Sequence, residues 1–150
     1  MARYVPLMTK PTDSQLATLG AAFETFTRRY KLAEAISAEK PLNEIDKQTL
    51  FYVAQHPACG PSDVARFLGT ANTTISSATD RMVKRGYLKR ERVEDDRRAV
   101  ALRLSDEGRA YVEVQLQMYR DMYRLMLDRL LPAERDQFIA MIAKIVYNDD

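Results

Sequence analysis

Apolar residues along most of the chain recur at spacings of three and four, which places them on one face of an α-helix. The first such stripe is Leu16, Leu19, Phe23, Phe26 and Tyr30. Asn43 and Ser105 suit N-caps, while proline suits a first helical turn and glycine a helix end. These signals predict six helices: residues 13 to about 38, 43 to about 55, 61 to about 68, 72 to about 85, one starting at Ser105 and one starting at Pro132.

One segment changes from helical spacing to strict alternation. Val100, Leu102 and Leu104 alternate with smaller or charged residues, which is typical of a half-buried strand. Residues 87–93 are the expected partner strand, and the charged residues 94–98 are expected to join the two strands as a hairpin loop. The predicted fold is therefore mainly α (α+β), in the order helix, helix, helix-turn-helix, β-hairpin wing, helix, helix.

Residues 61–85 have the pattern of a helix-turn-helix, with a turn at Gly69 and Thr70. An apolar stripe is expected to pack its two helices together: Val64, Ala65, Leu68, Ile75 and Met82. The outer face of the second helix then carries small hydroxyl and amide side chains: Asn72, Thr73, Thr74, Ser76 and Ser77. Such side chains approach phosphates and base edges closely, although a capped and solvated helix face is the alternative.

Charge is concentrated in one part of the chain. The net charge is +2, which by itself does not identify a nucleic-acid binder. Between Arg81 and Arg103, however, nine basic residues stand against four acidic ones, a net charge of +5. A basic segment that covers a recognition helix and a hairpin favours binding to duplex DNA, with Arg81 among the contacts; a merely solvated charged surface is the alternative.

Other classes of protein receive less support from the sequence. Charged residues interrupt every apolar stretch well short of the ~18 residues of a membrane span, and no signal-peptide pattern is visible, so we expect a cytoplasmic protein. One cysteine and one histidine favour neither a disulfide framework nor a zinc site, and no cofactor is expected. No catalytic motif is apparent, so an enzyme and a winged helix used only for protein interaction remain as alternatives.

Four segments resemble the MarR (multiple antibiotic resistance regulator) family. LGTANTTI at 68–75 and DRMVKRGYL at 80–88 resemble its helix-turn-helix and the start of its wing, while DRRA at 96–99 and LSDEG at 104–108 resemble its wing signature and the start of its long dimerisation helix. The resemblance covers residues 42–108 in detail and the flanking helices in pattern. It implies a transcription regulator, expected to be a repressor, that binds a pseudo-palindromic operator as a homodimer and is released by a small-molecule ligand.

The resemblance also implies roles for wing residues. Arg98 aligns with the wing-tip arginine that enters the minor groove, and Asp96 aligns with the acid that orients it. A narrow minor groove concentrates negative potential, and a carboxylate fixes a guanidinium through a charge-assisted hydrogen bond. Asp95 and Arg97 repeat the same spacing, so Arg97 belongs to the predicted wing site as well.

The recognition helix departs from the family at two positions. Ala71 stands where the family often has a serine N-cap, so Thr70 or Asn72 is expected to cap the helix instead. Ser77 stands where many members carry arginine. Both departures concern the operator sequence rather than the fold.

The family's architecture further implies a helical dimerisation region at 1–40 and 106–150, and a winged helix-turn-helix at 41–105, within one compact subunit. Family members bind small, often aromatic, anions between these regions. Candidate lining residues are Tyr30, Phe51, Tyr52, His56 and Tyr111, for each of which ordinary packing is the simpler interpretation. Relatives that sense peroxide use a cysteine near the N-terminal helix, so Cys59 is expected to be inert.

Overall fold

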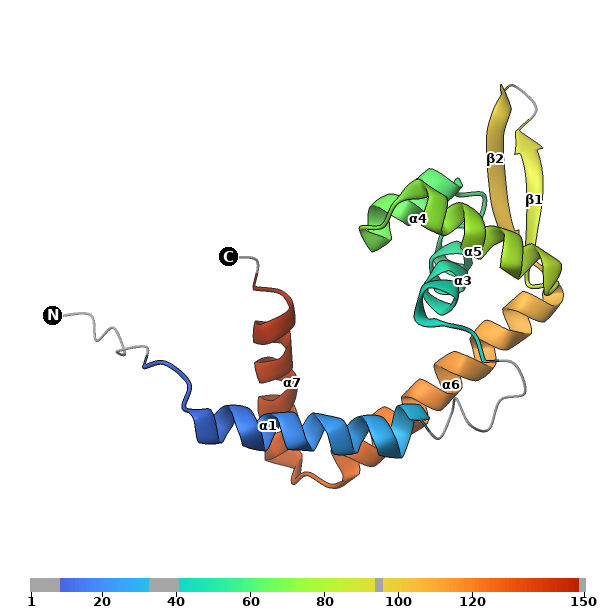
Figure 1. Cartoon of the computed structure of the whole chain (residues 1–150). Coiled ribbons are helices and arrows are strands. Elements are labelled where there is room, and N and C mark those ends of the chain that lie inside the picture. Colours follow the sequence, from blue (N-terminus) through green and yellow to red (C-terminus); the bar gives the residue numbers. More distant parts are fainter. Residues whose placement is uncertain (1–8, 33–40, 94–95, 149–150) are drawn as a thin grey trace, which may run out of the picture. The chain divides into compact units, whose positions relative to one another are not determined.

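Figure 1 shows the computed structural model of the chain, which divides into two compact units, Met1–Pro41 and Leu42–Asp150. The structure describes residues 9–32, 41–93 and 96–148, apart from the side chains of residues 31, 32 and 96–98. The first unit contains helix α1 (Asp13–Phe26), which continues as the π-helix η1 (Thr27–Leu32). The expected extension of this helix to residue 38 lies outside the described residues.

Helix α1 has a well-defined start but no core of its own. The Thr12 hydroxyl accepts a hydrogen bond from the Gln15 amide at 3.1 Å, and the Gln15 side chain accepts one from the Thr12 amide at 2.9 Å. This reciprocal capping box satisfies two amides that the helix itself cannot. No α1 residue is buried, and the predicted stripe residues Leu16, Leu19 and Phe23 are all exposed.

The second unit confirms the predicted order of elements. Asn43 caps its first helix by accepting the Asp46 amide at 2.8 Å, and Gly69 and Gly86 follow the ends of two others with φ of +65° and +81°. Positive φ is accessible to glycine at little cost, which explains why these helices stop there. The elements are α3 (Glu44–Gln55), α4 (Pro61–Leu68), α5 (Asn72–Lys84), β1 (Leu88–Val93), β2 (Asp96–Leu104), α6 (Asp106–Asp128) and α7 (Pro132–Val146).

One hydrophobic core joins α3, α4, α5 and the base of the hairpin. Its fully buried apolar side chains are Leu50, Val53, Val64, Ile75, Met82 and Leu102. Burial of each such side chain contributes roughly 1.5–3 kcal/mol to folding. The predicted stripe between α4 and α5 is therefore confirmed, with Leu68 only partly buried against the core.

The hairpin differs from the prediction at its outer end. Strands β1 and β2 pair antiparallel from Leu88 opposite Leu104 to Arg92 opposite Val100, and the register then shifts so that Val93 pairs with Asp96. The prediction of a loop is wrong for residues 96–98, because β2 already begins at Asp96, while residues 94 and 95 lie outside the described residues. Only Leu88 is buried in β1, so the outer hairpin lies away from the core and accommodates charged residues within a strand.

The hairpin ends in a tight junction with α6. Ser105 caps α6 by accepting the Gly108 amide at 3.0 Å, and its own hydroxyl donates to the Gly86 carbonyl. The Ser105 amide donates to the Tyr87 carbonyl at 3.0 Å. A Cβ atom on Gly108 would overlap that carbonyl oxygen and lie 2.9 Å from its carbon, so only glycine fits here.

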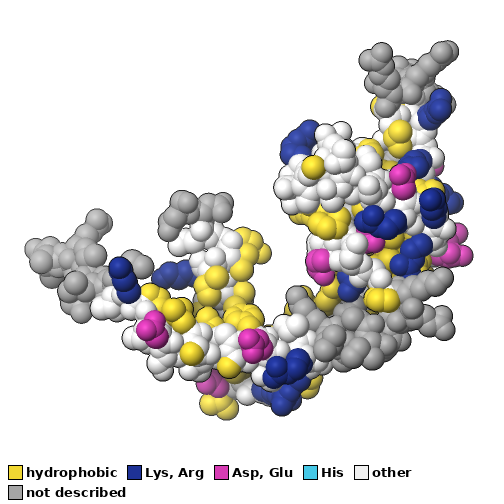
Figure 2. Space-filling model, in the orientation of Figure 1, with side chains coloured by type: hydrophobic (Ala, Val, Ile, Leu, Met, Phe, Trp, Pro, Cys, Tyr) yellow, Lys and Arg dark blue, Asp and Glu magenta, His cyan; other side chains and the backbone are white. Residues whose placement is uncertain are grey.

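Helices α6 and α7 bury little beyond this junction. In α6 the buried residues are Gly108, Val112 and Gln115, and α7 has none. Figure 2 shows hydrophobic side chains along α7. Many apolar residues of both helices are exposed, among them Leu116, Tyr123 and Leu125 on α6, and Ile139, Met141, Ile142 and Ile145 on α7.

Gly108→Ala is expected to lower the free energy of unfolding by on the order of 2 kcal/mol, because the Tyr87 backbone must move to admit the methyl group. Gly20→Ala is the matched control, since a Cβ there meets nothing within 4 Å and alanine favours a helix. Chemical denaturation measures both. Equal stabilities for the two variants would show that the junction is not tight.

Candidate nucleic-acid interface

Helix α5 divides cleanly into a buried and an exposed face. Ile75, Ala78, Thr79 and Met82 are buried against the core, and the Thr79 hydroxyl donates to the Ile75 carbonyl at 2.7 Å. All five polar residues predicted for the outer face are exposed: Asn72, Thr73, Thr74, Ser76 and Ser77. The core therefore fixes the rotation of α5 and presents small hydrogen-bonding side chains to the surroundings.

The start of α5 has no side-chain cap. Ala71 occupies the N-cap position, and the predicted capping by Thr70 or Asn72 is wrong. The Thr70 hydroxyl is instead buried and has no hydrogen-bond partner within the described structure. Its amide donates to the Ala65 carbonyl at 3.0 Å, which holds the turn and directs the side chain inward. The first amides of α5 thus receive no hydrogen bond from a capping side chain and retain their capacity to bind an anion.

Arg81 has a partner that the sequence did not reveal. Its Nη2 lies 2.8 Å from Oδ1 of the buried Asp46 on α3, and its Nε lies 3.4 Å from Oδ2. This hydrogen bond raises the pKa of Arg81 above its ordinary value, so the guanidinium stays charged. The interaction ties α5 to α3, and a DNA contact by Arg81 remains a prediction.

Two further ion pairs occupy basic residues of the hairpin. Arg90 on β1 pairs with Asp80 on α5, and Arg103 on β2 pairs with Glu91 on β1 at 2.9 Å. The remaining described basic side chains include the exposed Lys84, Lys89 and Arg92, and Figure 2 shows Lys and Arg gathered around this part of the molecule. The charge of the segment therefore both attracts anions and holds elements together.

The predicted wing-tip residues lie at the outer end of the hairpin. The backbone of Asp96, Arg97 and Arg98 forms the first residues of β2. Their side chains lie outside the described part of the structure, so the roles assigned to them remain predictions.

The predicted ligand-pocket residues of the second unit lie near other aromatic rings. In the second unit, Tyr52 stacks on His56 with ring centroids 4.2 Å apart, while Phe51 approaches Tyr119 at 6.1 Å. Tyr111 of α6 contacts Tyr87 at 5.1 Å. Tyr30 belongs to the other unit. A role in ligand binding remains a prediction for all five residues.

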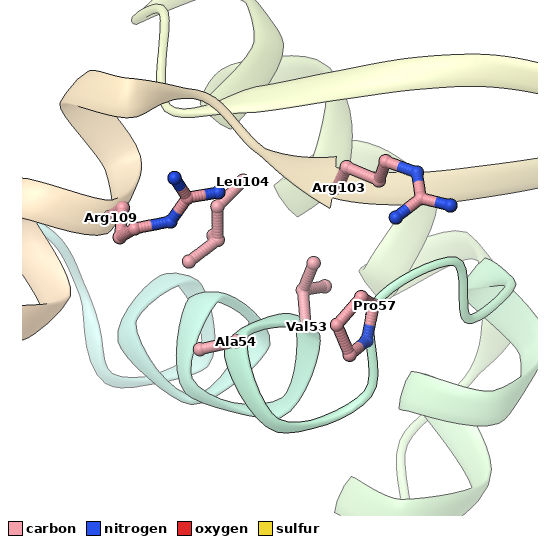
Figure 3. A pocket seen from close by; sticks show the side chains of 6 residues that line it. All are labelled: Val53, Ala54, Pro57, Arg103, Leu104 and Arg109. Atoms are coloured by element: carbon pink, nitrogen blue, oxygen red, sulfur yellow. The ribbon is translucent and has the colours of Figure 1, made fainter.

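A separate cavity of about 170 Å³ lies between the end of α3, the end of β2 and the start of α6 (Figure 3). It is lined by Val53, Ala54, Pro57, Arg103, Leu104 and Arg109, none of which was predicted as a ligand-pocket residue. Apolar side chains from α3 form one side, and the two arginines lie across from them (Figure 3). Sequence reasoning missed Arg103 at the end of β2 and Arg109 near the start of α6, which the strand-to-helix junction brings to one cavity.

Cys59 lies in the core beside the base of the hairpin. Its carbonyl accepts the Leu102 amide at 2.8 Å, and its side chain is buried. Burial raises the pKa of the Cys59 thiol, and the nearby Asp63 carboxylate raises it further. A thiol in this environment is weakly nucleophilic, which agrees with the expectation of an inert cysteine.

Two further properties concern the described residues alone. Over residues 9–32, 41–93 and 96–148, no helix is long and apolar enough to cross a membrane. Within the same ranges, His, Cys, Asp and Glu form no cluster of three or more that is suited to hold a metal ion.

A helix-turn-helix followed by an antiparallel hairpin on one core defines a winged-helix protein. Residues 41–99, which include the helix-turn-helix, match the sequence model of the MarR family. The matching curated proteins are all named as transcriptional regulators or repressors, which does not support the enzyme alternative.

Two curated proteins and one solved structure illustrate the similarity. The chain is 24% identical to the uncharacterised HTH-type regulator YwhA of Bacillus subtilis, over 85% of this chain and 91% of that one. It is 30% identical to the HTH-type regulator PecS of Dickeya dadantii, over 59% of this chain but only 53% of PecS. FabT of Streptococcus pneumoniae, solved in complex with DNA, superposes with a TM-score of 0.73 at 22% identity, over 89% of this chain and 92% of FabT.

Asp46→Asn is expected to lower the free energy of unfolding by about 1–2 kcal/mol, because it weakens a charge-assisted bond to Arg81 whose acid is buried. Asp106→Asn is the control, since Asp106 is almost fully exposed and its 3.6 Å pair with Arg109 lies within one helical turn. Thermal unfolding compares the two variants. Identical, small losses would mean that the Asp46–Arg81 pair does not hold α5 in place.

Proposed function

We propose that the chain is a cytoplasmic, DNA-binding transcription regulator that acts as a homodimer on a pseudo-palindromic operator, expected as a repressor. The observation that carries this proposal is the outer face of α5, where five small polar side chains lie exposed on a helix fixed by its buried face. A helix presented in this way fits the major groove, where hydrogen-bonding side chains distinguish base pairs. FabT, which has the same fold, was solved in complex with DNA, and this supports DNA as the partner.

The wing supplies the second contact in this proposal. Asp96, Arg97 and Arg98 stand at the far end of a hairpin whose base is anchored in the core by Leu88 and Leu102. An extended cation there is suited to the minor groove beside the site read by α5. We assign minor-groove insertion to Arg98, orientation of that arginine to Asp96, and an accessory contact to Arg97.

The terminal helices supply the dimer interface. We assign residues 1–40 and 106–150 to dimerisation and residues 41–105 to DNA binding. Exposed apolar stripes on α1, α6 and α7 support this division, because soluble monomers rarely expose several such surfaces. A twofold dimer then presents two copies of α5, which matches a pseudo-palindromic operator.

Release by a small-molecule ligand is the regulatory part of the proposal. The cavity between α3, β2 and α6 suits a small anion with an apolar body, since Arg103 and Arg109 lie across from Val53 and Ala54 (Figure 3). Arginine binds carboxylates through paired hydrogen bonds. A ligand there would contact both the end of the hairpin and the start of α6.

Alanine substitution of Asn72, Thr73, Thr74 or Ser76 is expected to weaken binding to a duplex selected from random-sequence DNA. Each good base contact that is lost costs roughly 1–3 kcal/mol, while affinity for unselected DNA changes little. Fluorescence anisotropy measures both affinities, and Gln117→Ala on the exposed surface of α6 is the control. Equal weakening on both duplexes would assign α5 to phosphate contacts alone.

Arg98→Ala is expected to weaken operator binding strongly and leave dimerisation and thermal stability nearly unchanged, because an outer hairpin position contributes little to the core. The slope of the logarithm of the binding constant against the logarithm of salt concentration should fall in magnitude by up to about 1 for each lost ionic contact. A dimer loses two such contacts, hence up to about 2. Asp96→Ala should give a smaller loss. Losses that simply add in the double variant would contradict an orienting role for Asp96.

A further inference from the structure

An ion pair connects the recognition helix directly to the wing. The Nη2 group of Arg90 on β1 donates to Oδ1 of Asp80 on α5. Both side chains remain partly in solvent, with exposed fractions of 40% for Arg90 and 59% for Asp80. An exposed pair of this kind stabilises a fold only slightly, so stability does not explain its presence.

Asp80 occupies the face of α5 that is proposed to meet DNA. Thr73, Ser77, Asp80 and Lys84 follow each other at spacings of four, three and four, which places them on one side of the helix. All four are exposed. The negative charge of a carboxylate on a DNA-binding surface by itself opposes binding. Asp80 can therefore favour binding only by holding Arg90 in position.

Arg90 lies where the hairpin leaves the core. Side chains alternate along a strand, so Arg90 shares a face with Leu88, and Leu88 is buried. Arg90 also stands opposite the fully buried Leu102 of β2. Beyond Leu88 every residue of β1 is exposed. The bond to Asp80 therefore attaches β1 to α5 at the level of Leu102, where the side chains of β1 itself are already exposed.

We propose that Asp80 and Arg90 are positioning residues that fix the angle between the wing and the recognition helix, so that both reach one DNA half-site together. This inference rests on the proposed DNA-binding function. It assigns a favourable role in DNA binding to an acidic residue on the DNA-facing side of α5. The competing account is that Arg90 binds a phosphate directly and Asp80 merely lies beside it.

The two accounts predict opposite effects of Asp80→Asn. If the pair positions the wing, removing this negative charge weakens binding to the selected duplex by about tenfold or more, the order of one good contact. If Arg90 instead binds phosphate, Asp80→Asn leaves binding unchanged or tightens it, and only Arg90→Gln weakens it. Asp80→Glu keeps the charge and is expected to restore most of the affinity.

The hairpin offers a matched control pair. Arg103 and Glu91 form an ion pair of the same chemistry, with exposed fractions of 47% and 53%, but both lie within the hairpin and do not join it to α5. Glu91→Gln is therefore expected to leave DNA affinity unchanged or slightly higher. Thermal unfolding of Asp80→Asn and Glu91→Gln should agree within about 2 °C, since both pairs are exposed.

The experiment is fluorescence anisotropy of the 150-residue chain with its selected duplex, comparing wild type, Asp80→Asn, Asp80→Glu, Arg90→Gln, Asp80→Asn/Arg90→Gln and Glu91→Gln. Weakening by Asp80→Asn, recovery by Asp80→Glu, and a double variant no weaker than Arg90→Gln alone support the positioning role. If the wild type binds the duplex and the Asp80→Asn variant binds it equally tightly, the positioning role is overturned while the proposed function stands. A wild-type chain that selects no duplex overturns both.

Discussion

The arrangement of this chain depends on the close contact between the backbones of Tyr87 and Gly108. At that point the turn that leads from α5 into β1 meets the first turn of α6, and Ser105 bonds to both through its amide and hydroxyl. No side chain separates the segments, so a displacement of α6 is passed to the recognition helix and the wing together. A ligand in the neighbouring cavity would act on this same junction.

Basic residues in the winged helix have two roles, which the net charge of the segment does not distinguish. The segment from Arg81 to Arg103 carries +5, which attracts DNA over a long range. Three of its arginines are also bonded to carboxylates that join α5 to α3, α5 to β1, and β1 to β2. These paired arginines hold in place the helices and strands that carry the remaining basic residues.

The sequence predicted what depends on local pattern. Spacing and caps placed the helices because the relevant interactions lie within four residues, as at Asn43 and Ser105. It missed the partner of Arg81, which lies 35 residues away on another helix. It also misplaced the start of β2, since charged residues suggest a loop unless an exposed strand accommodates them. It gave no sign of the cavity lined by Arg103 and Arg109, because that cavity depends on a strand-to-helix junction that no local pattern encodes.

The central claim is that two copies of this chain read one duplex through paired α5 helices. Analytical ultracentrifugation of the chain alone, and with a duplex selected from random-sequence DNA, tests it most directly. The account predicts a dimer at micromolar concentration, two chains per duplex, and a selected sequence of two inverted half-sites about one helical turn apart. A monomer that binds one chain per duplex, or a selection that yields no inverted repeat, would contradict it.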